Sequence, residues 1–376
     1  MLSACAPSFG DDNEVVQETD SQEKKAIIPK STSDSDYSVI LPFEPGKARG
    51  LTADNLNTRL DLDKFETGLM DFAQESFPSD QDFYYQEGQY LTEDQVRGWL
   101  RYKYDGAALK TKQDEAKKNK QEYKNTGLNP AITDLNATDT PKYLASVLEQ
   151  NYLKKVDEKT VKISGVVIGV ALNSVHYYKE NDYARETALD DAKIRQEGER
   201  IAAEIVKQAR ENKEIADVPI RVALYKQAPK SSIVPGEFIA QTEAKAGSSS
   251  LEGWKDINES YQFFPSPEAN QQKPEDADTF ERFKEDIGDY FPNYTGVIGK
   301  AHYKDDEMKS LKIEIPMQFY GKAEVIALTQ FVNQKISQYF PQDYIDLEVN
   351  ITSTSGQEAL IVRKAGDEKP VTHIFK

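Results

Sequence analysis

The sequence has little of the chemistry that metals, disulfides and nucleic acids require. Its 376 residues include one cysteine, three histidines and two tryptophans. A Cys-rich zinc site, a disulfide framework and an iron–sulfur cluster all need several cysteines, so these are excluded. Basic residues number 47 against 64 acidic ones, for a formal net charge of −17. Because phosphate binding needs concentrated Lys and Arg, no nucleic-acid partner is expected. No metal or other cofactor is expected either.

Long apolar runs are also missing. The longest apolar stretch, residues 166–172, has seven residues, whereas a membrane-spanning helix needs about 20. The chain is therefore expected to be either lipid-anchored or soluble. The 20 tyrosines and 16 phenylalanines, together with abundant Ile and Val, can fill a core, so wholesale disorder is excluded.

The single cysteine stands at the start of the chain, in Met1-Leu2-Ser3-Ala4-Cys5. This pattern is typical of a bacterial lipobox, in which Leu2, Ser3 and Ala4 would fit a signal peptidase and Cys5 would accept a diacylglyceryl group. Two acyl chains hold a protein stably on a membrane. The alternative is a stray cysteine in an N-terminal tail. The charged start and apolar run of a full signal peptide are not in this sequence.

Composition and helix signals suggest how the first 150 residues are organised. Residues 1–50 are rich in Asp, Glu, Ser, Lys and Pro and are predicted to form a flexible tether, with apolar patches at 26–28 and 39–41 that could dock on the body. Residues 51–150 are predicted to be the helical N-terminal part of the body. Asp63 is expected to cap one helix, Thr92 and Gln95 form a capping box for a second, and a short amphipathic helix is expected at 143–148.

The rest of the chain shows signs of an internal duplication. Residues 167–171 align with 297–301 at a spacing of 130, and each is followed by an apolar helical stripe, an alternating strand and a closing strand. Two related strand-helix-strand-strand halves are therefore predicted at 151–245 and 291–376, joined by a loop linker at 246–290. The expected class is α+β, with helices packed on mainly antiparallel sheet. Whether the halves share one sheet is left open by the pattern.

Seven strings in the chain are long and unusual: 65–70, 85–91, 127–130, 173–178, 232–236, 291–299 and 315–324. They resemble the CamS sex-pheromone precursor lipoproteins of Gram-positive bacteria. The resemblance covers nearly all of the chain from Arg49 onward, and it implies a protein held on the outer face of the cell membrane through Cys5. It also implies that a pheromone peptide is cut from the signal sequence ahead of that cysteine, of which only residues 2–4 lie in this chain.

The sequence gives little support for any catalytic residue. Ser174 and His176 would share one face of a strand, which suggests a nucleophilic dyad, but neighbours on one strand rarely have the angle for proton transfer and no Gly-x-Ser-x-Gly elbow is present. Gly169 and Gly299 lack phosphate-loop spacing and are expected to allow close packing inside a strand. No catalytic residue is predicted, although paired carboxylates acting on a glycan have no sequence signature.

Aromatic residues beside Gln, Asn and Glu favour binding over catalysis, because tyrosine offers an apolar face with a polar tip. The alternative is that these rings fill the core. A pheromone precursor whose mature body binds a peptide or cell-wall ligand is the first hypothesis. An envelope interaction protein is the second, and an enzyme acting on an envelope polymer ranks last. The sequence does not indicate an oligomeric state. The candidate binding residues are Tyr84, Tyr85, Tyr90, His176, Tyr177, Tyr178 and Tyr320.

Overall fold

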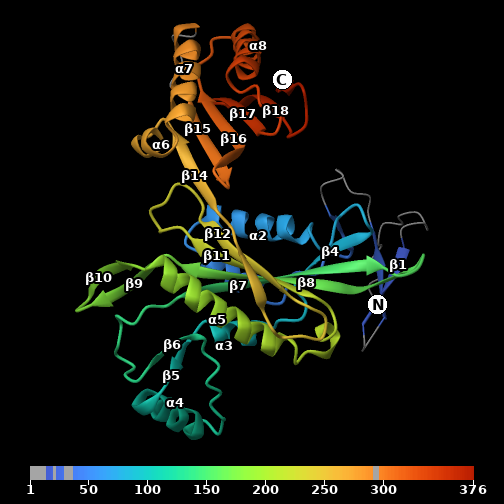
Figure 1. Ribbon diagram of the computed structural model, residues 1–376, viewed down its shortest axis with the longest axis vertical. Helices are drawn as coiled ribbons and strands as arrows, with labels where there is room; N and C mark the ends of the chain where they lie inside the picture. The colour runs from blue at the N-terminus through green and yellow to red at the C-terminus, as the bar shows by residue number, and fades with distance from the viewer. Residues whose placement is uncertain (1–13, 20–22, 29–36, 291–295) are drawn as a thin grey trace. The chain divides into compact units, whose positions relative to one another are not determined.

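The chain folds into two units, Met1–Ile257 and Asn258–Lys376, in a computed structural model that describes residues 14–19, 23–28, 37–290 and 296–376 (Figure 1). The described residues form eight α-helices and nineteen β-strands in mixed sheets, which confirms the predicted α+β class. Each unit has its own main sheet, of nine strands in the first and six in the second, and the first unit also has two two-stranded sheets. The two sequence halves therefore do not share one sheet.

The first unit contains five α-helices and thirteen strands within its described residues. Its helices are Arg49–Asn55 (α1), Arg59–Ala73 (α2), Glu93–Trp99 (α3), Gly106–Lys118 (α4) and Asp191–Ala209 (α5), with a 3-10 turn at Lys213–Ile215. Its strands are Glu14–Glu18 (β1), Glu23–Ile27 (β2), Ser38–Val39 (β3), Phe83–Glu87 (β4), Tyr102–Tyr104 (β5), Asn129–Ile132 (β6), Leu144–Lys155 (β7), Thr160–Asn173 (β8), Val175–Glu180 (β9), Tyr183–Ala188 (β10), Ile220–Gln227 (β11), Glu237–Ala244 (β12) and Glu252–Asp256 (β13).

The first unit is a three-layer arrangement centred on β8. The main path of its sheet runs β13-β12-β11-β8-β7-β4-β3, and β8 is parallel to β11 and antiparallel to β7. Figure 1 shows α2 on one face of this sheet and α5 on the other. Val167 and Ala171 pack with the α2 side, whereas Val166 and Ile168 pack with the α5 side. Burial on both faces explains why this strand is a continuous apolar run.

The N-terminal segment is more structured than the sequence suggests. β1 pairs with β2 and, in parallel, with β8, so residues 14–18 and 23–27 belong to the sheet and the prediction of a tether was wrong for them. Ala26 and Ile40 are both 4% exposed, as the docking of the two apolar patches requires. The lipobox residues Leu2, Ser3, Ala4 and Cys5 lie outside the described residues.

The segment 51–150 is only partly helical. Helix α3 begins with the predicted Thr92–Gln95 capping box. Helix α2 begins earlier than expected, because Thr58 rather than Asp63 accepts the capping N–H, from Asp61. Residues 143–148 were wrongly predicted as a helix, since β7 occupies 144–155 and is buried on both sides along most of its length. Such a strand lacks the alternation that would identify it.

The second unit begins well before the predicted half at 291. Residues 246–290, expected as a loop linker, contain β13 and then the strand Glu259–Phe264 (β14) and helices Pro267–Gln272 (α6) and Pro274–Tyr290 (α7). Helices α7 and α8 pack on one face of the six-stranded sheet and share one apolar core with it. The remaining elements are Ile298–Lys304 (β15), Glu307–Pro316 (β16), Lys322–Tyr339 (α8), Asp346–Ser353 (β17), Gly356–Arg363 (β18) and Val371–Ile374 (β19).

The two units share an order of elements, as the predicted duplication requires, but this order is displaced by one strand from the aligned residues. In the first unit β8, α5, β11 and β12 occur in this order, with the β9–β10 hairpin inserted between β8 and α5; β11 is parallel to β8 and β12 antiparallel to β11. In the second unit β16, α8, β17 and β18 have the same order and the same directions. The matching strand is therefore β16, whereas residues 298–301 of the aligned string belong to β15.

Gly169 is required by close packing, as the sequence predicted, and this is testable. A Cβ at Gly169 would lie 2.5 Å from Cζ of Phe65 and 2.6 Å from Cδ1 of Leu69, both from α2. We expect Gly169→Ala to lower the free energy of unfolding by about 1–3 kcal/mol, because overpacking forces the helix and sheet apart. Gly50→Ala in α1, where a Cβ meets nothing within 4 Å, is the control and should cost nothing. Equal urea midpoints for the two variants would contradict the packing argument.

Gly299 plays the corresponding role in the second unit. A Cβ at this position would lie 2.4 Å from Cε2 of Phe280 in α7. Both glycines thus allow a helix to approach its sheet more closely than any larger side chain would permit.

Candidate functional site

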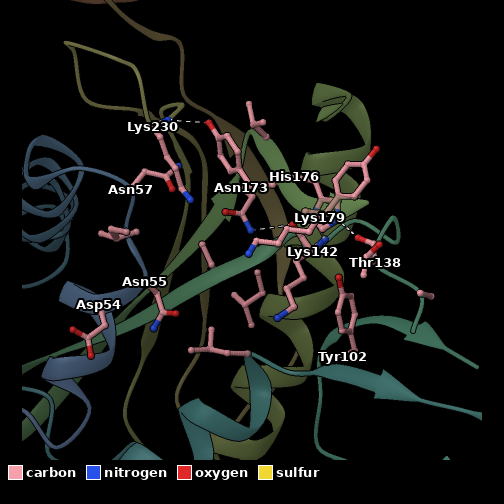
Figure 2. A pocket seen from close by; sticks show the side chains of 18 residues that line it. Asp54, Asn55, Asn57, Tyr102, Thr138, Lys142, Asn173, His176, Lys179 and Lys230 are labelled. Carbon is pink, nitrogen blue, oxygen red and sulfur yellow. Dashed lines mark hydrogen bonds between the residues drawn. The ribbon is translucent and has the colours of Figure 1, made fainter. Parts of the chain in front are cut away.

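A cleft of about 540 Å³ opens in the first unit, within the size range of small-molecule sites. Its lining comes from segments far apart in the sequence, and Figure 2 shows the labelled side chains reaching it from both sides. One side is the end of α1 and the following loop, with Asp54, Asn55 and Asn57. The other includes Tyr102 of β5 and Thr138, and strands β8 and β9 lie between them.

His176 holds the wall of this cleft together. Its Nδ1 accepts a hydrogen bond from the backbone N–H of Lys142 at 3.4 Å, and its Nε2 lies 3.0 Å from the carbonyl oxygen of Thr138. Nε2 therefore carries the proton and donates. The imidazole is buried and stacks on Tyr178, with ring centroids 5.2 Å apart. Because backbone groups occupy both ring nitrogens, His176 is a positioning residue and the weakly supported dyad with Ser174 has no free base.

Tyr177 and Lys230 form a second fixed element. The Tyr177 hydroxyl accepts a hydrogen bond from the backbone N–H of Lys230 at 3.0 Å, and the Lys230 ammonium lies 4.4 Å from the centroid of the Tyr177 ring. This doubly held pair fixes the loop after β11 against β9. Both ends of the loop are also held by the buried Asp61 of α2, whose Oδ1 accepts hydrogen bonds from the backbone N–H groups of Ala228 and Gly236.

Amide side chains link the strands beneath the cleft. The Gln227 side chain accepts a hydrogen bond from the backbone N–H of Asn57 at 2.8 Å and donates one to Asn173 at 2.6 Å. Asn173 in turn donates to the carbonyl oxygen of Lys142 at 2.9 Å. Each step joins a different segment of the chain, so the floor of the cleft is preorganised rather than formed by independent loops.

The cleft also contains groups whose pKa values are shifted. Burial lowers the pKa of the Lys142 ammonium, which lies 4.8 Å from the centroid of the Tyr102 ring. Burial, with the nearby charge of Asp139, raises the pKa of Tyr102 to about 12, and its hydroxyl donates to the carbonyl oxygen of Thr140 at 2.6 Å. Tyr102 is therefore a neutral, fixed ring at neutral pH.

The structure brings together only part of the predicted binding set. His176, Tyr177 and Tyr178 line the cleft. Tyr85 and Tyr90 are buried in two core clusters. Tyr84 is half-buried, with its hydroxyl 3.3 Å from Asp82, and Tyr320 is 85% exposed but belongs to the second unit. The polar cleft residues that sequence reasoning missed are Asp54, Asn55, Asn57, Tyr102, Thr138, Lys142, Asn173, Lys179 and Lys230.

The string at 85–91 has a structural explanation centred on Glu149 of β7. Its buried carboxylate accepts hydrogen bonds from the backbone N–H groups of Gln89, Tyr90 and Leu91, the shortest being 2.7 Å from Leu91. A Cβ at Gly88 would lie 2.6 Å from the Glu149 Cβ, so only glycine allows this approach. Burial raises the pKa of Glu149 to about 7, although the N–H donors pull it down.

The described ranges offer neither a metal cluster nor a membrane-spanning helix. No group of three or more His, Cys, Asp or Glu side chains is arranged to hold a metal ion there. No helix in those ranges has the length and hydropathy needed to cross a membrane.

The fold and the sequence together define the class of protein. Residues 43–369 match the family described as the CamS sex pheromone cAM373 precursor. The chain therefore belongs to the CamS family, as the sequence strings indicated.

Solved structures agree with this assignment. The C-terminal domain of the sex pheromone staph-cAM373 precursor from Staphylococcus aureus is 32% identical, with a TM-score of 0.74 over 87% of this chain and 100% of that one. The sex pheromone precursor from Lactobacillus salivarius is 27% identical, with a TM-score of 0.80 over 93% of this chain and 99% of that one. No curated protein matches the sequence.

Proposed function

We propose that this chain is a lipid-anchored extracytoplasmic protein whose first unit binds a ligand in the cleft beside β9. The lipobox pattern ending at Cys5 supports the anchor, and two acyl chains give stable attachment. The solved relatives are described as sex pheromone precursors, so a peptide released from the signal sequence is part of the proposal. The mature body then has a separate role at the cell surface.

The observation that carries the binding proposal is the construction of the cleft. Its volume of about 540 Å³ suits a small ligand or a short segment of a polymer. Its walls are tied by His176, Tyr177 and the amides of Asn173 and Gln227, so the opening exists before a ligand arrives. Preorganisation of this kind lowers the entropic cost of binding.

Mass spectrometry tests the anchor. The mature N-terminus of the protein recovered from its own cells should carry a diacylglyceryl group on Cys5, and a short hydrophobic peptide should be present in the medium. An unmodified Cys5 on the mature protein would overturn the lipoprotein assignment.

Steric closure of the cleft tests the binding role. We expect Ala137→Trp, which places a large ring among the lining residues, to weaken binding of cell-wall fragments or extracellular peptides at least tenfold by isothermal titration. Leu135→Trp is the matched control, since Leu135 lies on the same loop, is 39% exposed and does not line the cleft. Equal affinities for the two variants, or no heat with any of these probes, would count against the proposal.

A further inference from the structure

The lining of the cleft has an excess of basic residues, whereas the chain as a whole has an excess of acidic ones. Across the whole sequence acidic residues exceed basic ones, 64 to 47, yet the lining contains Lys142, Lys179 and Lys230 and a single carboxylate, that of Asp54. A local excess of positive charge on an acidic protein draws anions to one place and repels them elsewhere.

These lysines have no acidic partner in the described part of the chain. Many other lysines do: Lys226, for example, lies 2.7 Å from Glu237 and 3.1 Å from Asp191. Within the described ranges, by contrast, no carboxylate lies within 4.0 Å of the ammonium groups of Lys142, Lys179 or Lys230. A half-buried, uncompensated ammonium such as that of Lys142 costs free energy that an incoming anion would recover.

Aromatic faces hold two of the three ammonium groups. Lys142 lies over the Tyr102 ring at 4.8 Å and Lys230 over the Tyr177 ring at 4.4 Å. Such contacts orient an ammonium but are weaker than a charge-assisted hydrogen bond to a desolvated anion in good geometry. Both rings are fixed by their own hydroxyl contacts, to Thr140 and to the Lys230 backbone. The ammonium groups are thus positioned without being neutralised.

We infer that the cleft binds an anionic ligand that carries phosphate or carboxylate groups, with Lys142, Lys179 and Lys230 as its charge partners. This inference rests on the proposed binding function and specifies its ligand class. Lysine acts as a point charge that suits phosphate and carboxylate alike, whereas the bidentate geometry of arginine is absent from the lining. Neutral amides of Asn55 and Asn57, across the cleft from Lys142 and Tyr102, suit the polar remainder of such a ligand (Figure 2).

Calorimetric titration of the full chain with three probes tests the inference. Pyrophosphate supplies phosphate, citrate supplies carboxylates, and diacetylchitobiose is an uncharged saccharide. At least one anion should bind at 50 mM salt and weaken severalfold at 300 mM, as expected for ammonium–anion contacts. Binding of pyrophosphate alone would identify a phosphate-bearing ligand, and binding of citrate alone a carboxylate-bearing one.

Charge-matched variants locate the binding. The triple variant Lys142→Gln, Lys179→Gln and Lys230→Gln should lose at least tenfold in anion affinity. A control with Lys110→Gln, Lys117→Gln and Lys118→Gln, all exposed on α4 and outside the cleft, changes the net charge equally and should bind as the unaltered chain does. Thermal melting of both variants establishes that they are folded.

The outcomes separate the two levels of the proposal. Absence of heat with both anions, or equal loss in the two triple variants, overturns the anionic ligand class. If diacetylchitobiose binds in that case and Ala137→Trp abolishes it, the binding cleft stands while the ligand class is wrong. If no probe binds and Ala137→Trp has no effect on cell-wall fragments or peptides, both are wrong.

Discussion

Replacing Asp61 with alanine is expected to lower the free energy of unfolding by about 3–5 kcal/mol. This carboxylate of α2 is fully buried, and its Oδ1 accepts hydrogen bonds from the Tyr225 hydroxyl and the backbone N–H groups of Ala228 and Gly236 at 2.9–3.0 Å. Its Oδ2 accepts one from the Thr58 hydroxyl at 2.7 Å. Alanine leaves several buried donors without an acceptor, and each such donor costs about 1–3 kcal/mol.

Two further variants at α2 sharpen this prediction. Asp61→Asn keeps an oxygen at the Oδ1 position and puts an amide opposite Thr58, so it should cost about 1 kcal/mol. Asp63→Ala removes an exposed carboxylate that pairs with Arg59 at 3.2 Å, and should cost less than about 0.5 kcal/mol. Urea denaturation measures all three. Equal midpoints for Asp61→Ala and Asp63→Ala would show that the buried anchor is not needed.

The stability of the protein is expected to fall as pH rises from 5 to 8, because of Glu149. Its folded pKa of about 7 lies above the ordinary glutamate value of 4.5, so folding favours the protonated form. Stability from this group is complete below the unfolded pKa and is lost as pH rises through the folded one. At about 1.4 kcal/mol per pKa unit, the loss between pH 5 and pH 8 is about 2–3 kcal/mol.

Glu149→Gln isolates this contribution. Glutamine resembles the protonated acid and does not titrate, so the variant's stability should be nearly independent of pH over the same range. Glu122→Gln, at an exposed position before β6, should keep the slope of the unaltered chain. Carboxyls with lowered pKa, such as Asp286 bonded to Lys335 and Tyr339, lose their contribution only as pH falls through acidic values. A flat profile for the unaltered chain would show that the N–H donors keep Glu149 ionised.

Local patterns predicted the elements that present one apolar face. The stripe Ile194, Ile201 and Ile205 of α5 is buried as expected, and so are Leu328 and Val332 of α8. The capping box at Thr92 is also correct, because its two hydrogen bonds depend on residues three apart.

Two elements, β7 and α7, were misassigned for different reasons. β7 was mistaken for a helix because Tyr143, Val147 and Leu148 fall at helical spacing while the strand itself has no alternation. Helix α7 was mistaken for a loop on the strength of its Pro and acidic residues, although Phe280, Phe283 and Ile287 have helical spacing and are buried. The loop prediction relied on the composition of this segment, whereas the spacing of its apolar residues indicates the helix correctly.

The candidate cleft was predictable only where its residues were contiguous. His176, Tyr177 and Tyr178 form one short string, and all three line it. Lys142 and Lys230 lie on loops that meet only through pairing of distant strands, and no short-range signal marks them. Tyr85 and Tyr90 belong to a string that packs around the buried Glu149, and both rings lie in the core. The unusual sequence of this string is therefore explained by packing and not by ligand binding.

The division at residue 257 has a consequence for how the chain is made. β13 ends at Asp256 and β14 begins at Glu259, and among the described strands none pairs across this point. The first sheet, including the distant parallel pair of Val16 with Thr160, can therefore be completed before the ribosome has released residues 258–376. Because domains fold as units in order of synthesis, the cleft can form while the second unit is still being translated.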